Sequence, residues 1–396
     1  MNCVPESTDV HDAAQTAPVP LLFRPAAKNT ALTLKVVSTF KEFQALKTDW
    51  NGLLEQTGVD RVYMTHEWFT AWWRAFGDGK CLFIVLVTNG DHIYGIVPLM
   101  RFTGRFRGMP VRAIGFMENE DSPGCSFIVK RGYEQVVEDV ISFIMNDVGH
   151  WDVLLLKNMP GDETDRIAEF LNRNVARRIR HMTTGGLKSP YLNINGDWET
   201  FFGGISVTRK KTLRNIGNRL KKLGDITIKE HGSAEKLNEM AVVSEKAWKH
   251  KEGIAFISQK ERRRFFQYLS EIAQHNGWLS IWFMYKTNEP IAYEYHLKYK
   301  RSDTALLSDF DADYSNVSPG ANLDYEVVKT LFGRGITEYD MCGAPDDYKK
   351  KWTDDMKNYK NLVVFNDSLY ARLLYVFERR IVDSIKRILR RRNSAP

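Results

Sequence analysis

Residues 304–332 read TALLSDFDADYSNVSPGANLDYEVVKTLF, which is an apolar run, a polar loop and an amphipathic segment in that order. Residues 304–308 have strand length, and residues 323–332 repeat apolar side chains at helical spacing. Ser318-Pro-Gly320 stands directly before the predicted helix. A helix N-terminus presents unpaired N–H groups and a partial positive charge. The loop 315–320 is therefore suited to hold a phosphate or pyrophosphate, although Ser-Pro-Gly is also common where a loop simply turns into a helix.

The segments around this stretch predict an α/β fold with mixed sheets. Residues 279–285 and 291–298 form a predicted hairpin, and a short strand is expected over 338–341. The first half repeats this order of elements. Its counterparts are a hairpin over 81–87 and 93–100, a helix over 135–145 and a strand over 151–156. We therefore predict two copies of one α/β unit, with a helical insert over 202–223, 234–251 and 259–275.

Length and composition agree with two globular units. The 396 residues include 43% hydrophobic and 12% aromatic residues, enough for two cores. No apolar run reaches the roughly 18–20 residues that a membrane-spanning helix needs, so a cytoplasmic location is expected. The predicted organisation is a disordered leader (1–29), two α/β domains (30–190 and 191–370) and a basic C-terminal helix (371–396). The cysteines and histidines show neither CxxC nor HExxH spacing, so no metal is expected.

Positive charge is concentrated in two segments of a chain whose formal net charge is +7. The C-terminal segment combines basic residues with apolar residues at steps of three and four. It is predicted either to dock on its own domain or to bind peripherally at the inner face of a membrane. The second segment is the predicted helix 208–223, whose basic residues can attract phosphate. These residues are Arg209, Lys210, Lys211, Arg214, Arg219, Lys221 and Lys222. A solvated helix face is the alternative interpretation.

A group of residues that can carry chemistry follows the predicted strand 338–341. Asp340 is followed by Tyr348, Lys349 and Trp352. Ligand sites in open α/β sheets gather at the C-terminal ends of strands. Asp340 is the candidate base or positioning acid, and Tyr348 and Lys349 are candidates for stabilising or protonating a leaving group. Asp340 could equally serve as a cap or an ion-pair partner.

His296 is a second catalytic candidate. It shares one face of the predicted strand 291–298 with Ala292, Glu294 and Lys298. An alternation of this kind, with three polar members, predicts a face exposed to solvent.

The second half resembles the acetyltransferase domain of the CelD/BcsL type, a GNAT-related group linked to cellulose and exopolysaccharide biosynthesis. The resemblance covers about residues 190–365, and more loosely 65–72 and 95–98. It rests on Arg264-Phe265, Pro290-Ile-Ala292, Asp311, Ser318-Pro-Gly320, Asp340, Gly343, Tyr348-Lys349 and Trp352. The fuller GNAT phosphate loop, with several glycines and a leading Gln or Arg, is absent.

The resemblance implies a tandem GNAT fold, similar to that of the FemABX aminoacyl transferases, with the acyl donor in the second unit only. It implies acyl transfer from acetyl-CoA or another acyl-CoA to a hydroxyl or amine of a glycan or nucleotide-sugar precursor. The leaving group would then be a thiolate. The expected donor-binding residues are Val317, Ser318, Pro319, Gly320, Ala321 and Asn322, and the expected substrate-binding residues are Arg214, Asp311 and Trp352.

Two other functions remain open from the sequence. One is a FemABX-like transferase that takes its acyl group from an aminoacyl-tRNA. The other is a catalytically degenerate scaffold beside inner-membrane polysaccharide machinery, placed there by the basic C-terminal segment. DNA binding is not expected, because the basic residues accompany neither a helix-turn-helix nor a zinc pattern.

Overall fold

The computed structural model describes residues 32–173, 179–220 and 223–380. The predicted leader, Lys221, Lys222 and residues 381–396 of the predicted C-terminal helix lie outside these ranges. The strands are β1 (Thr33–Val37), β2 (Cys81–Leu82), β3 (Ile84–Asn89), β4 (His92–Val97), β5 (Leu99–Phe106), β6 (Met109–Phe116), β7 (Ile128–Val129), β8 (Val153–Pro160), β9 (Arg180–Asn193), β10 (Ile226–His231), β11 (Leu279–Lys286), β12 (Glu289–Tyr299), β13 (Ser302–Phe310), β14 (Glu338–Asp340) and β15 (Met356–Phe365).

The helices lie mainly between the strands of each half. They are α1 (Phe40–Ala45), α2 (Lys47–Leu54), α3 (His66–Phe76), α4 (Val136–Asn146), α5 (Gly161–Arg173), α6 (Trp198–Gly204), α7 (Val207–Leu220), α8 (Leu237–Lys246), α9 (Trp248–Lys251), α10 (Lys260–His275) and α11 (Pro319–Leu331). A further helix covers residues 369–380. Short 3-10 helices include η4 (Ala312–Val317) and η5 (Lys349–Lys351).

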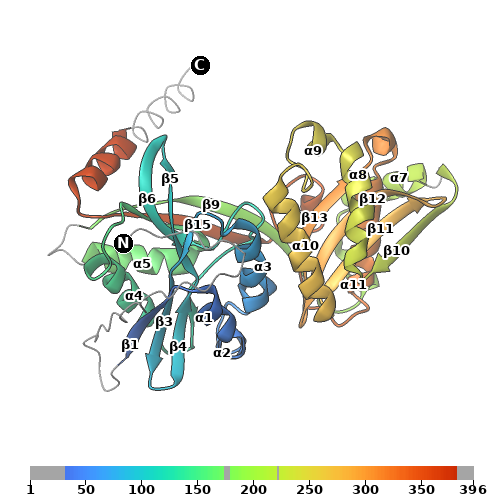
Figure 1. Ribbon diagram of the computed structural model, residues 1–396. Coiled ribbons are helices and arrows are strands. Elements are labelled where there is room, and N and C mark those ends of the chain that lie inside the picture. Colours follow the sequence, from blue (N-terminus) through green and yellow to red (C-terminus); the bar gives the residue numbers. More distant parts are fainter. Residues whose placement is uncertain (1–31, 174–178, 221–222, 381–396) are drawn as a thin grey trace, which may run out of the picture.

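The described strands form two sheets. A four-stranded antiparallel sheet has the order β1-β3-β4-β7, and an eleven-stranded mixed sheet has the order β10-β11-β12-β13-β14-β9-β15-β8-β6-β5-β2. The large sheet runs through both halves of the molecule (Figure 1). The long strands β9 and β15 form its middle and connect the two halves.

The predicted internal repeat is visible in the strand pairing. In the first half β1, β3, β4 and β7 pair in the same antiparallel order as β10, β11, β12 and β13 in the second half. In the second half, β14 follows α11 and pairs in parallel with β13. In the first half, β8 follows α4 but pairs in parallel with β6. The hairpin β5–β6 lies between β4 and β7 in the chain. Its strand β6 pairs with β8, and so takes the position that β13 has beside β14 in the second half.

The predicted domain boundary near residue 190 falls inside β9. Beyond the second half, β15 returns to the first and pairs with both β8 and β9. The chain thus crosses between the halves twice through adjacent antiparallel strands.

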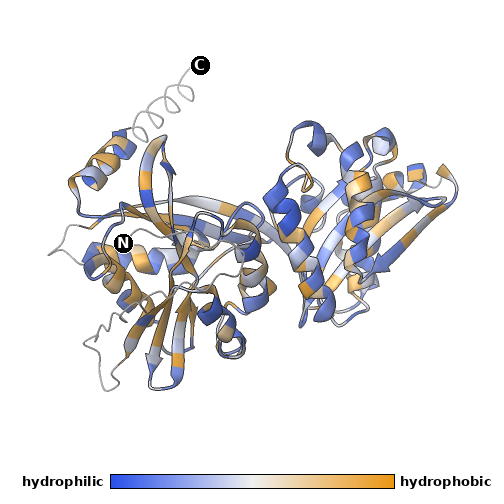
Figure 2. Cartoon of the chain, viewed as in Figure 1, coloured by the Kyte–Doolittle hydropathy of each residue, from blue (hydrophilic) through white to orange (hydrophobic). Residues whose placement is uncertain are grey.

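The two halves also share a hydrophobic core. Thr65 caps α3 by accepting a hydrogen bond from the backbone N–H of Trp68, and the aromatic side chains of α3 point inward. Trp68 packs edge-on against Phe265 of α10, with ring centroids 5.2 Å apart. A single cluster of buried residues extends from Leu34 in β1 to Leu297 in β12. Figure 2 shows many hydrophobic residues along the strands and many hydrophilic residues on the helices.

Candidate functional site

The strands β13 and β14 separate near their C-terminal ends. Their parallel register contains three residue pairs, the last of which joins Thr304 to Asp340. β14 ends there, whereas β13 continues to Phe310. Within the described residues, positions 305–310 of β13 therefore have no strand partner on the β14 side. This opening, which we call the splay, lies where ligands enter open α/β sheets.

The predicted phosphate loop lies at the end of β13. Ser318 is the N-cap of α11 in a left-handed conformation (φ 53°), and no side chain caps this helix. Pro319 occupies the first helical turn, and the backbone N–H groups of Gly320 and Ala321 belong to the same uncapped turn. Val317 is buried behind the loop. Backbone donors and the positive end of the helix dipole suit this turn to the phosphates of an acyl-CoA.

Asn322, predicted as a donor-binding residue, is used inside the protein. Its side chain is buried, and Nδ2 donates to the carbonyl oxygens of Val317 and Ser318 at 3.1 Å each. The same nitrogen reaches the carbonyl of Ile216 in α7 at 3.4 Å. Asn322 therefore fixes the shape of the loop and ties it to α7.

Tyr348 reaches the splay from the segment that follows β14. The hydroxyl of Ser308 in β13 is close enough to this phenol to lower its pKa. Burial, together with the charges of Asp324 and Glu294, raises the pKa of Tyr348 well above its usual value. The phenol therefore stays protonated at neutral pH and can donate a proton beside the open strand.

Asp340 and Lys349 are joined through Cys342. Asp340 is 2% exposed; one carboxylate oxygen accepts from the backbone N–H of Cys342 at 3.1 Å, and the other lies 2.5 Å from Nζ of Lys357. Lys349 Nζ donates to the carbonyl oxygens of Cys342 (2.5 Å) and Ala344 (3.2 Å). Burial lowers the pKa of Lys349. Burial also raises the pKa of the Cys342 thiol well above its usual value, which is typical of an unreactive cysteine.

Trp352 is buried against α11. Its indole N–H donates to Oδ2 of Asp324 at 2.5 Å. Burial raises the pKa of Asp324 to about 8, and the nearby charge of Glu294 adds to this effect. A neutral carboxylic acid thus lies behind the splay at pH 7.

Sequence reasoning missed a buried charge cluster in the second half. His296 donates to Glu294 at 3.0 Å through Nε2 and to Asp303 at 2.5 Å through Nδ1. Burial lowers the pKa of His296, but Asp303 and Glu294 outweigh that effect and raise it to about 10. Glu294 is paired with Ser308 across β12 and β13, so both side chains lie on the face from which Tyr348 approaches.

The prediction that this face of β12 is exposed to solvent was wrong. His296 is 0% exposed because α11 packs across β12. A usable signal was present in α11, where Asp324 lies among apolar residues at helical spacing. A carboxylate on a buried helix face needs polar partners on the sheet beneath it.

Two predicted substrate-binding residues lie near the loop. Asp311 is buried, accepts from the backbone N–H of Asp313 at 3.0 Å and lies 3.3 Å from Nζ of Lys246. It therefore caps η4 and forms an ion pair. Arg214 is exposed on α7. Its positive charge lowers the pKa of Tyr325 in α11, although burial raises that pKa overall. The exposed basic face of α7 thus borders the loop and the start of α11.

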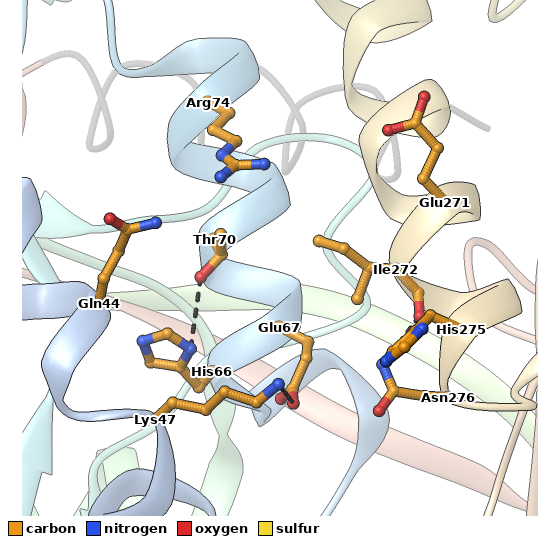
Figure 3. A pocket seen from close by; sticks show the side chains of 10 residues that line it. All are labelled: Gln44, Lys47, His66, Glu67, Thr70, Arg74, Glu271, Ile272, His275 and Asn276. Carbon is orange, nitrogen blue, oxygen red and sulfur yellow. Dashed lines mark hydrogen bonds and ion pairs between the residues drawn. The ribbon is translucent and has the colours of Figure 1, made fainter.

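A separate depression lies between α3 and α10 (Figure 3). It has a volume of about 360 Å³ and shares no lining residue with the loop or the splay. Two pairs of its polar side chains are joined to each other, because His66 contacts Thr70 and Lys47 lies 3.2 Å from Glu67. We therefore place the candidate site at the splay.

Within the described ranges, no group of three or more His, Cys, Asp or Glu side chains is arranged to hold a metal ion. The same residues include no helix with both the length and the apolar character needed to cross a bilayer.

Known proteins resemble part or most of this chain. Residues 208–350 match a family model described as an acetyltransferase (GNAT) domain. Among solved structures, FemX aligns with a TM-score of 0.56 at 9% identity, over 83% of this chain and 98% of its own. A conserved protein of unknown function from Bacteroides thetaiotaomicron VPI-5482 aligns with a TM-score of 0.52 at 10% identity, over 81% and 97% of the two chains. No curated protein sequence matches significantly.

The structural likeness at these identities concerns the fold, which consists of tandem GNAT-like units in a mixed α/β arrangement. The family match identifies residues 208–350 as a GNAT-type acetyltransferase domain, and the chain is accordingly an acyltransferase.

Proposed function

We propose that this acyltransferase moves an acyl group, most simply acetyl, from acyl-CoA to a hydroxyl or amine of a glycan or glycan precursor. The observation that carries the proposal is the splay of β13 from β14. It lies beside the uncapped N-terminus of α11 and within the stretch that matches the GNAT domain. The first half supports a single donor site, because β6 occupies the corresponding place beside β8.

The proposed mechanism assigns roles to groups at the splay. When bound, acyl-CoA supplies a thioester whose carbonyl carbon the acceptor attacks. Backbone N–H groups of Gly320 and Ala321 hold its phosphates. Tyr348, which stays protonated, gives its phenolic proton to the departing sulfur, and the proton that the acceptor hydroxyl or amine loses on acylation returns to the phenolate. Lys349 contributes positive charge to the same segment. Because both oxygens of Asp340 already have partners, positioning is its better supported role.

The acceptor is the part of the proposal that depends on the resemblance to the CelD/BcsL type. We infer a hydroxyl or amine of a sugar, including a nucleotide-linked sugar, used in exopolysaccharide or cellulose synthesis. This inference places the reaction in the cytoplasm, where acyl-CoA and nucleotide sugars are made. Acetyl transfer to a panel of amino sugars, nucleotide sugars and oligosaccharides, followed by mass spectrometry, identifies the acceptor.

Calorimetric titration with acetyl-CoA and longer acyl-CoAs tests the donor site. We expect micromolar binding by the wild type and its loss in Gly320→Trp, because the indole fills the approach to the α11 N-terminus. Gly333→Trp, at the exposed turn beyond the other end of α11, is the matched control and should bind normally. Failure of every acyl-CoA to bind would overturn the proposal.

Tyr348→Phe separates catalysis from binding. Removal of a proton donor typically costs 10²–10⁴-fold in rate. We expect kcat to fall by about that factor while acyl-CoA affinity stays unchanged. Tyr325→Phe, which removes a half-buried hydroxyl on α11, serves as the control. A fully active Tyr348→Phe enzyme would exclude the proposed role.

A second donor is favoured by the basic face of α7. Lys211, Arg214 and Arg219 are exposed and border the loop, and such a face can bind the backbone of a charged tRNA. RNase-sensitive transfer of an aminoacyl group, together with no binding of acyl-CoA, would favour this donor.

A further inference from the structure

The helix over residues 369–380 is fixed to the first half by one face. Ala371 and Leu374 are fully buried against the hairpin β5–β6 and strand β15. Glu378 receives two hydrogen bonds of 2.8 Å from Arg107 at the tip of that hairpin. The hydroxyl of Tyr370 donates to the carbonyl of Pro110 at 2.6 Å. Figure 1 shows this helix in red beside β5 and β6, at the end of the molecule farthest from the second half.

The opposite face of the same helix is apolar and faces water. Leu369 is 78% exposed, Leu373 68%, Val376 45% and Phe377 44%. These four positions follow the spacing i, i+4, i+7 and i+8, so they form one stripe. Neither packing against the rest of the described residues nor the acyl-transfer proposal accounts for it. Contiguous exposed apolar side chains mark contacts with a partner or a membrane.

The charges around the stripe indicate the kind of partner. Arg372, Arg379 and Arg380 lie on the same helix. The sequence that follows continues the charge, with five basic residues against the single acid Asp383. These residues are Lys386, Arg387, Arg390, Arg391 and Arg392. An apolar stripe flanked by cations suits a bilayer surface with anionic headgroups, where each basic side chain adds attraction.

A second copy of the chain is a poorer occupant. In a two-fold symmetric contact, the same patch of each copy faces itself. The three arginines of the helix would then face their own counterparts. Repulsion between like charges opposes such a dimer, whereas anionic lipid neutralises the same charges.

We propose that the helix 369–380 docks the protein peripherally on an anionic phospholipid surface. Leu369, Leu373, Val376 and Phe377 enter the boundary between headgroups and acyl chains, and Arg372, Arg379 and Arg380 contact headgroup phosphates. The inference does not depend on the identity of the acyl donor or acceptor.

Co-sedimentation of the full-length chain with vesicles tests this surface. The vesicles are pure phosphatidylcholine, or phosphatidylcholine with about a third phosphatidylglycerol. We expect binding to the anionic vesicles that weakens as salt rises, because surface charges are screened. Leu373→Asp combined with Phe377→Asp should weaken binding at least tenfold. Arg379→Gln combined with Arg380→Gln should weaken it and reduce its salt dependence.

Val242→Asp combined with Ile254→Asp is the matched control. Both residues are apolar and similarly exposed, at 46% and 48%, but lie in the second half. This variant should bind vesicles like the wild type, and circular dichroism should show every variant folded. Three results would overturn the proposal: no binding to anionic vesicles at low salt, equal binding to both kinds of vesicle, or a wild-type dimer in light scattering that Leu373→Asp with Phe377→Asp dissolves.

Discussion

At the residue scale, the second half concentrates buried charge beneath α11. His296 is held between Glu294 and Asp303, and Asp324 faces the same region from the helix above. Burying this many charges is costly unless they are paired. The imidazolium of His296 offsets one of the two negative charges beside it, whereas burial and the charge of Glu294 keep Asp324 protonated. The proton on Asp324 therefore depends on the folded state.

Asp324→Asn should remove a pH dependence from stability. The pKa of Asp324 is raised to about 8 in the folded chain, against an ordinary value of 3.8. Between about pH 4 and 8 the unfolded chain binds fewer protons, so the free energy of unfolding falls as pH rises, by at most about 1.4 kcal/mol per pH unit. The asparagine variant lacks this contribution and can still accept from Trp352. Urea unfolding at pH 5, 6.5 and 8 measures the difference between the two proteins.

Comparison with the variant isolates Asp324, because His296 titrates in both proteins. The raised pKa of His296 gives stability that is fully present below about pH 6.5 and is lost as pH rises through about 10. Asp347→Asn, at a side chain 99% exposed, is the control and should follow the wild type. Parallel pH profiles for wild type and Asp324→Asn would contradict the assignment.

At the scale of elements, the start of α11 is shaped by a side chain one turn into the helix. Ser318 adopts a left-handed conformation, and the side-chain amide of Asn322 donates to the carbonyl oxygens of Val317 and Ser318. The amide thus holds the loop in the shape that its backbone N–H groups need for binding phosphate. Preorganisation of this kind reduces the cost of binding.

Asn322→Ala should therefore weaken acyl-CoA binding without touching the ligand. We expect about a tenfold rise in Kd, and a loss of about 1–3 kcal/mol in stability from the unsatisfied carbonyl groups. Calorimetry and thermal unfolding measure the two effects. Asn218→Ala, at an exposed position on α7, is the control. An unchanged Kd would show that the loop keeps its shape without Asn322.

At the scale of the whole molecule, the two repeats are joined too closely to behave as independent domains. The large sheet and one core cluster extend through both halves. Ion pairs cross between them, with Arg61 2.7 Å from Glu338 and Arg262 2.8 Å from Asp121. Loss of either half would expose apolar surface and unpaired strand edges on the other.

We therefore predict one cooperative unfolding transition for both halves. Native-state hydrogen exchange should give the same opening free energy for β3 in the first half and β12 in the second. Phe265→Ala, which empties the contact with Trp68, should lower both values by about 3–5 kcal/mol. Phe102→Ala, at a partly buried side chain away from that contact, should likewise lower the β3 and β12 values by equal amounts. Two separate transitions would contradict this view of the fold.

The sequence by itself determined the repeated order of elements and the strand, loop and helix around Ser318-Pro-Gly320. These features follow from local periodicity and turn chemistry, which act over a few residues. It also indicated Tyr348, Lys349 and Trp352 as candidates, because they follow the strand that lies beside the splay in the structure.

Only the tertiary structure decided what each polar residue contacts. Glu294 and His296 form an alternating pattern that is the same for an exposed strand and for one covered by α11, so the sequence could not distinguish them. The pairing of β15 with β8 joins segments far apart in the chain. Lys357 reaches Asp340 from 17 residues away, on a different strand. Burial and long-range pairing depend on which surfaces pack together, and local sequence patterns do not encode that packing.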